Sequence, residues 1–180
     1  NPKVLLEFKT KSANVKHLLE LDVPKNVVCS WSLNTTAIVE NEEHFTASLD
    51  QRIGAARKAA DGGIKVAFHF HPIVHYDGWK ADYTELVEKV LGTFSTEEVL
   101  FVSFGSVTFI KPVIQKLREQ GHHSKMLQME MVPDPHGKLS YPDEVKVEIF
   151  EHMYGLFQPW RNKVFQYLCM ERAYFWDEVF

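Results

Sequence analysis

The chain has 180 residues, of which 45% are hydrophobic and 24% charged, and its formal net charge is -4. This composition fits one soluble globular domain with a real core and argues against disorder, and no apolar run approaches the ~20 residues that cross a bilayer. The acidic excess gives no general field that would hold a polyanion, so unaided nucleic-acid binding is not expected.

Five apolar runs rich in β-branched and aromatic residues have the length and composition of strands. They are Val4–Lys9, Val27–Leu33, Lys65–Phe70, Val99–Phe104 and Val164–Met170. We expect these strands to be buried on both faces.

Segments of helical period separate the strands. A helix capped by Thr46 or Ser48 runs through Ala60, and Gly62-Gly63 follows it as an expected left-handed cap. The other predicted helices are Ala13–Leu21, Trp79–Leu91, Pro112–Gln120 and Asp143–Phe157. The β-α-β-α order predicts parallel strands joined by right-handed crossovers, and therefore an α/β fold.

Such a series forms either an open doubly wound sheet or part of a closed barrel, and both place ligand groups at the carboxyl ends of the strands. We expect a single domain over residues 1–180, without linkers or repeats. The chain begins at Asn1 rather than Met, which suggests a fragment with residues missing upstream. Open strand edges and uncovered apolar surface would then predict self-association.

Polar residues follow every predicted strand, which indicates a shared site at that rim. Lys11 comes directly after the first strand, where its ammonium would suit a carboxylate or phosphate, or would be an ordinary surface lysine. On the second strand Ser30, Ser32 and Asn34 fall on one face. They can bind a sugar or an amino-acid group, or hydrogen-bond to neighbouring backbone.

Three histidines offer an alternative interpretation of the same rim. His69 and His71 alternate along the third strand and point to one side, and His75 follows in the loop. A His-x-His pair at a strand end can begin the metal site of a barrel hydrolase, with His75 or Glu171 as a further ligand. We expect hydrogen-bonded histidines and no metal, and the hydrolase remains the alternative.

The sequence contains only Cys29 and Cys169. These are too few for a disulfide scaffold or any cysteine-ligated iron–sulfur cluster, so a reducing cytoplasm is the expected location. Each is expected to be a small core hydrophobe. The sequence has no P-loop, G-x-G-x-x-G or G-x-S-x-G motif.

The strand ends together resemble the spore photoproduct lyase family of radical SAM proteins. The resemblance is carried, in the family's order, by KTKSANVKHLL at 9–19, SWSLN at 30–34, FHFHPI at 68–73, DGW at 77–79 and CME at 169–171. It covers nearly the whole chain and begins about midway through such a protein. It implies the C-terminal part of a partial (β/α) TIM-type barrel, with about five parallel strands and crossover helices.

The resemblance also implies cofactors. In the family, a 4Fe–4S cluster held by an upstream cysteine motif cleaves S-adenosylmethionine, and the resulting radical abstracts hydrogen from the substrate. By position, Lys11 corresponds to a lysine that contacts the carboxylate of S-adenosylmethionine and Ser32 to a serine that contacts the same cofactor. The backbone at His71 and Pro72 corresponds to the cofactor-facing end of the next strand. With Asn34, these are the expected cofactor-binding residues, and no catalytic residue is assigned.

The founding enzyme of the family repairs a crosslinked thymine photoproduct in DNA, so damaged DNA is a possible partner of the parent protein. Among the departures from the family, many relatives carry Asp at His71 and a DGKxRY segment where this chain reads HGKLSY at 136–141, and the basic C-terminal segment has no counterpart in Ala173–Phe180. We interpret the chain as the C-terminal half of a radical SAM enzyme that supplies part of the cofactor rim. It would need the missing N-terminal part of its own barrel, and alone it should be inactive and bind no cluster.

Overall fold

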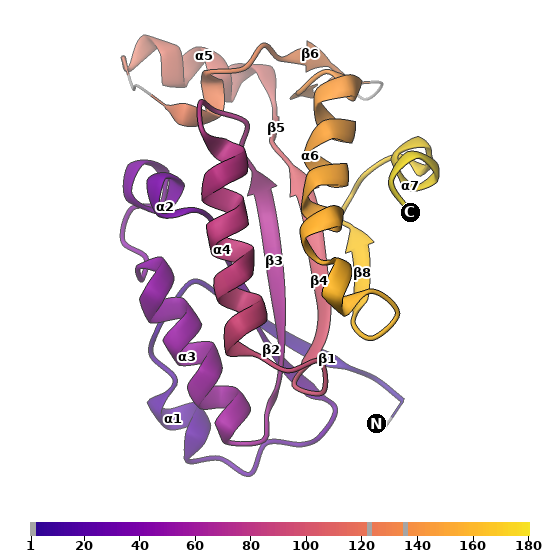
Figure 1. The fold of residues 1–180 in the computed structure, drawn as a ribbon. Coiled ribbons are helices and arrows are strands. Elements are labelled where there is room, and N and C mark those ends of the chain that lie inside the picture. Colours follow the sequence, from indigo (N-terminus) through magenta and orange to yellow (C-terminus); the bar gives the residue numbers. More distant parts are fainter. Residues whose placement is uncertain (1–2, 122–123, 135–136) are drawn as a thin grey trace.

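The computed structural model describes residues 3–121, 124–134 and 137–180, and its main feature is a sheet of five parallel strands (Figure 1). The strand order is β1-β2-β3-β4-β8. The strands are β1 (Leu6–Thr10), β2 (Val27–Ser32), β3 (Lys65–Ile73), β4 (Val99–Ser106) and β8 (Phe165–Leu168). All five predicted strands and their parallel course are therefore confirmed.

Three long helices cover one face of this sheet: α3 (Leu49–Asp61), α4 (Trp79–Thr93) and α6 (Asp143–Leu156) (Figure 1). The start of α3 is fixed by a capping box in which Ser48 and Gln51 bond to each other's backbone N–H. Gly63 follows the helix at φ 80°, a conformation that favours glycine. The core between helices and sheet is built from buried aromatic and aliphatic side chains, among them Trp31, Ile53, Phe68, Phe70, Tyr83, Phe104 and Phe150.

The expectation that every strand is buried on both faces is wrong for the two outer strands of the sheet, β1 and β8; on β8, Phe165 is 65% exposed. Leu6 is 48% and Phe8 57% exposed, whereas every residue of β2 is buried. In the part of the chain that the structure describes, β1 is an edge strand that pairs only with β2. The helix after it, α1 (Lys16–Leu19), is shorter than predicted and has no buried residue, so it covers little of the strand.

Several elements were not predicted from the sequence. A three-stranded antiparallel sheet, in the order β5-β7-β6, lies beyond the carboxyl ends of β3 and β4 (Figure 1). Its strands are β5 (Thr108–Phe109), β6 (Val132–Pro133) and β7 (Leu139–Ser140). Between β5 and β6 in sequence lie the unpredicted 3-10 turn η1 (Lys125–Leu127) and α5 (Lys111–Glu119), which confirms the predicted helix Pro112–Gln120. Further unpredicted elements are α2 (Thr36–Glu42), the 3-10 turn η2 (Gln158–Trp160) and α7 (Ala173–Val179). Two-residue strands are too short to give an alternating pattern.

Within the described ranges, no helix combines the length and the apolar character that crossing a membrane requires.

Candidate functional site

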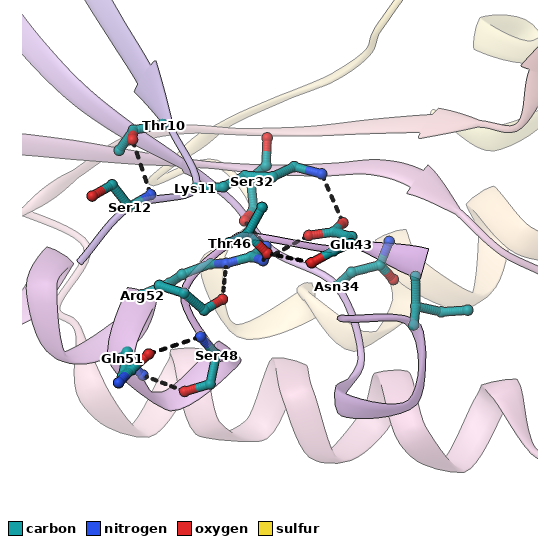
Figure 2. Close-up of polar contacts among 12 residues, drawn as sticks. Thr10, Lys11, Ser12, Ser32, Asn34, Glu43, Thr46, Ser48, Gln51 and Arg52 are labelled. Carbon is teal, nitrogen blue, oxygen red and sulfur yellow. Dashed lines mark hydrogen bonds and ion pairs between the residues drawn. The ribbon is translucent and has the colours of Figure 1, made fainter. Parts of the chain in front are cut away.

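The carboxyl ends of the five parallel strands lie along one edge of the main sheet, and Lys11 stands at that edge directly after β1. Its ammonium nitrogen is 2.8 Å from Oε1 of Glu43, the residue that caps the C-terminus of α2 (Figure 2). The Lys11 side chain is 36% exposed and the Glu43 side chain only 5%. The lysine therefore faces solvent at the rim while its carboxylate partner is buried beneath it.

Arg52 of α3 holds the other side of this carboxylate. Its side chain is fully buried, and Nη2 lies 2.7 Å from Oε2 of Glu43. The two groups form an ion pair, but their geometry is not that of a hydrogen bond. The guanidinium also donates to the carbonyls of Ala47 and Ser32, at 2.8 and 3.0 Å, and to the hydroxyl of Thr46 at 2.7 Å (Figure 2). Arg52 thus joins the end of β2 to the loop after α2.

Ser32 and Asn34 lie at the end of β2 beside this group, and both are buried. The Asn34 side chain is occupied by the protein: Nδ2 donates to the Pro72 carbonyl at 2.9 Å, and Oδ1 accepts from the Tyr83 hydroxyl at 2.6 Å and from the Thr35 N–H. Asn34 therefore holds the end of β3 in place.

His71 lies farther along the rim, on β3, beside a cavity of about 810 Å³. Its ring packs against Gly105 so closely that a Cβ there would meet the ring at 2.8 Å, which explains the need for glycine on β4. Burial lowers the pKa of His71 below its ordinary value of 6.5. The neutral imidazole therefore forms part of the cavity wall, which Ser106, Lys138, Lys146, Cys169 and Glu171 also line.

His69 has a different environment, one layer below His71. Its Nε2 lies 2.5 Å from Oε1 of Glu7, which also accepts from the Ser30 hydroxyl at 2.5 Å, and its Nδ1 lies 2.6 Å from the Ser103 hydroxyl. Burial lowers the pKa of His69, and the Glu7 carboxylate opposes this shift. His69 is thus a hydrogen-bonded residue that links four strands.

His75 does not join His69 and His71. Its backbone N–H donates to the Tyr141 hydroxyl at 3.2 Å, and its ring lies against Trp79. Among the residues that the structure describes, no group of three His, Cys, Asp or Glu side chains could hold a metal ion. The geometry that the hydrolase alternative needs is therefore not formed by these residues.

Glu171, the other candidate ligand, forms a buried ion pair instead. Its Oε2 lies 2.8 Å from the Lys146 ammonium, and its Oε1 accepts from the Ser106 hydroxyl at 2.8 Å. Both charged side chains are less than a tenth exposed, at 8% for Lys146 and 6% for Glu171. The pair connects α6 to the end of β8 at the cavity wall.

Sequence reasoning missed Glu43 and Arg52. A signal for Arg52 was present, because it lies on the same side of α3 as Leu49 and Ala56, within the apolar stripe. A charge at such a position requires a buried counter-ion. The sequence pattern does not reveal which acidic residue is the counter-ion of Arg52, because Glu43 follows α2 in a segment without helical or strand periodicity.

Comparison with known proteins places the chain in a family. The model of the family described as spore photoproduct lyase matches residues 1–147. The spore photoproduct lyase of Clostridium acetobutylicum is 33% identical over 94 residues, which are 52% of this chain and 28% of that protein. The lyase of a Geobacillus strain is 29% identical over 123 residues, 67% of this chain and 36% of that protein.

The fold has solved counterparts as well. A spore photoproduct lyase in complex with dinucleoside spore photoproduct superposes with a TM-score of 0.74 and 25% identity. The match covers 91% of this chain and 50% of the lyase chain. The lyase is a radical SAM protein with a TIM-type barrel. The chain therefore spans about half the length of the solved enzyme.

Proposed function

The chain belongs to the spore photoproduct lyase family, and we propose that it forms the C-terminal half of a radical SAM enzyme and supplies part of the rim that binds S-adenosylmethionine. The observation that carries the proposal is the partly exposed side chain of Lys11 at the end of β1, beside the end of β2. Ligands of parallel α/β folds bind at this end of the strands.

The charges around Lys11 fit the carboxylate of S-adenosylmethionine. Lys11 and Arg52 contribute two positive charges and Glu43 one negative charge, so the three side chains sum to +1. The excess charge lies nearest to solvent on Lys11, because Arg52 is fully buried. An anionic group that enters the rim would meet the ammonium first.

The other expected cofactor residues divide into two groups in this proposal. Ser32 lies at the rim and would offer its hydroxyl to the cofactor, while Asn34 fixes the Pro72 carbonyl. The backbone at His71 and Pro72 would face the cofactor from β3.

The iron–sulfur cluster does not fit the residues of this chain. Three closely spaced thiolates are needed, and the sequence has only Cys29, which is buried in the core, and Cys169, which lines the cavity. Residues outside this chain would have to hold the cluster. After anaerobic reconstitution, we expect the 180-residue chain to show no cluster absorbance and no bound iron; stoichiometric cluster iron would contradict this.

For the substrate, we propose a thymine photoproduct of DNA or a related molecule that reacts by hydrogen abstraction. A spore photoproduct lyase similar to this chain has been solved in complex with dinucleoside spore photoproduct. In this chain, the cavity of about 810 Å³ beside His71 would hold the substrate next to the proposed cofactor site. An anaerobic assay of the full-length protein with dinucleoside spore photoproduct tests this. Release of the repaired dinucleotide is expected, and turnover of S-adenosylmethionine without repair would indicate a different substrate.

The rim itself is tested by equilibrium binding of S-adenosylmethionine to the full-length protein, including any residues that precede Asn1. Lys11→Ala should weaken binding more than Ser32→Ala, because a charge-assisted contact contributes roughly 1.5–3 kcal/mol and a neutral hydroxyl contact ~1 kcal/mol. Lys89→Ala, which removes the cation of an exposed ion pair between α4 and Asp50 of α3, is the control. Unchanged binding by Lys11→Ala together with loss of binding by Ser32→Ala would refute the assignment of Lys11.

A further inference from the structure

Glu43 is a buried acid at the cofactor rim whose role the proposed function leaves open. Its side chain is 5% exposed, and a carboxylate so far removed from water must be paired. Both of its oxygens lie at ion-pair distance from a cation, Oε1 from Lys11 and Oε2 from Arg52. The carboxylate therefore bridges a partly exposed lysine and a fully buried arginine.

The arginine side of this bridge is rigid. Arg52 is anchored by three bonds to the carbonyls of Ser32 and Ala47 and to the hydroxyl of Thr46. Thr46 in turn donates to the backbone carbonyl of Glu43 at 2.8 Å. The guanidinium is a planar group whose donors have fixed directions, so its orientation sets the position of the carboxylate.

Without the contact to Glu43, the Lys11 side chain would be flexible. A lysine side chain has four rotatable methylene groups, and its ammonium has three N–H donors. One contact to Glu43 restrains the side chain and leaves donors available to a ligand. A ligand that binds a restrained ammonium loses less side-chain freedom than one that must order the lysine itself.

From this arrangement, which rests on the proposed function, we infer that Glu43 is the positioning residue for Lys11. Anchored by Arg52, it holds the ammonium at the rim in the place where the carboxylate of S-adenosylmethionine binds. Glu43 acts through Lys11 and makes no contact with the cofactor. Toward Lys11 the role requires an acceptor oxygen, while the negative charge of Glu43 serves the fully buried guanidinium of Arg52.

The experiment is a set of Glu43 variants of the full-length protein, titrated calorimetrically with S-adenosylmethionine. We expect Glu43→Ala to raise the dissociation constant about tenfold, the scale of freeing one lysine side chain. Glu43→Gln, which keeps an acceptor, should stay within about threefold of the wild type. Glu40→Ala, which removes an exposed acid from the same helix α2, is the matched control and should leave binding unchanged.

A second set of variants separates positioning from a general effect on the fold. In a Lys11→Met background, Glu43→Ala should cause no further loss of binding, because the residue through which it acts is absent. Glu43→Asp keeps the charge that Arg52 needs but withdraws the carboxylate by one methylene. It should weaken binding severalfold only when Lys11 is present, and it serves if Glu43→Ala fails to fold.

Two results would overturn the inference while leaving the proposed function intact. One is wild-type affinity in Glu43→Ala, and the other is an equal loss of affinity with and without Lys11. If the wild-type protein itself binds no S-adenosylmethionine, the proposed function fails, and this inference fails with it.

Discussion

His69 Nε2 lies 2.5 Å from Glu7 Oε1, and this contact joins the central strand β3 to the edge strand β1 across the intervening β2. The same carboxylate oxygen accepts from Ser30 on β2, and the other nitrogen of the imidazole contacts Ser103 on β4. One polar network therefore crosses four neighbouring strands on the face opposite the long helices. Neighbouring parallel strands are joined by long crossover connections and are therefore distant in sequence. These side-chain hydrogen bonds link such strands directly.

The network predicts a loss of stability on mild acidification. Burial lowers the pKa of His69 in the folded protein below its ordinary value of 6.5, so the unfolded chain binds more protons near that pH. Stability from this effect is present above pH ~6.5 and is lost as the pH falls toward the folded pKa. Burial shifts the pKa values of His71 and His152 in the same direction, so they add to the loss.

Urea unfolding of the chain at several values between about pH 7.5 and pH 5 measures this dependence. His69→Gln should flatten the curve, because one of the contributing groups is removed, and it should also lower stability at pH 7.5 by about 1–2 kcal/mol. His17→Gln, at a side chain that is 86% exposed, is the control and should leave the stability at pH 7.5 unchanged. A curve for His69→Gln parallel to the wild type would show that this imidazole stays free to titrate in the fold.

The buried Lys146–Glu171 pair predicts a strong coupling between α6 and the end of β8. Lys146→Met leaves a carboxylate that is 6% exposed without its cation and should cost about 3 kcal/mol of unfolding free energy. Glu171→Gln should cost a similar amount, because it leaves the Lys146 ammonium buried. The double variant should lose less than the sum of the two, and additive losses would contradict a direct interaction. Lys89→Met, at an exposed pair, should change stability by less than ~0.5 kcal/mol.

Glu98 predicts a second pH dependence, at lower pH. Hydrogen bonds from the Arg57 guanidinium lower the pKa of Glu98 from 4.5 to about 2. A carboxyl group with a depressed folded pKa contributes stability above its ordinary pKa and loses it as the pH falls toward the folded value. Glu98→Gln should therefore cost about 1 kcal/mol at pH 7, a figure reduced for solvent screening because the side chain is 29% exposed. The difference from wild type should vanish near pH 2, and a pH-independent difference would argue against the ion pair.

The sheet could be predicted from the sequence because its evidence is local. Each of β2, β3 and β4 is a run of apolar and β-branched residues, and α3 begins at a residue that the sequence identifies as a cap. The second sheet could not, since β5, β6 and β7 have two residues each and pair over distances that periodicity does not report. The exposure of β1 was missed because an edge strand and a central strand can share one composition.

At the rim, the sequence identified residue types but not their partners. The position of Lys11 after a strand predicted an ammonium at the edge of the sheet, and the structure places it there. Its partner Glu43 comes from a loop more than thirty residues away in sequence, and the pairing depends on where α2 and α3 set that loop. Similarly, Asn34 was expected at the rim, but its bond to the Pro72 carbonyl follows from the pairing of β2 with β3.

The exposed edge of the main sheet predicts that the 180-residue chain on its own associates with itself. Leu6 and Phe8 on β1 are 48% and 57% exposed, and within the described ranges the strand pairs only with β2, so its outer backbone groups can pair with another chain.

Light scattering coupled to size exclusion should show dimers or larger species whose fraction rises with protein concentration. Leu6→Lys combined with Phe8→Lys should shift the chain toward the monomer, because charges on an edge strand oppose pairing. Phe45→Lys, at a fully exposed phenylalanine in the loop after α2, adds a charge outside β1 and should leave the association unchanged. A wild-type chain that remains monomeric at high concentration would show that β1 is protected, whereas equal dissociation by Phe45→Lys would assign the effect to net charge.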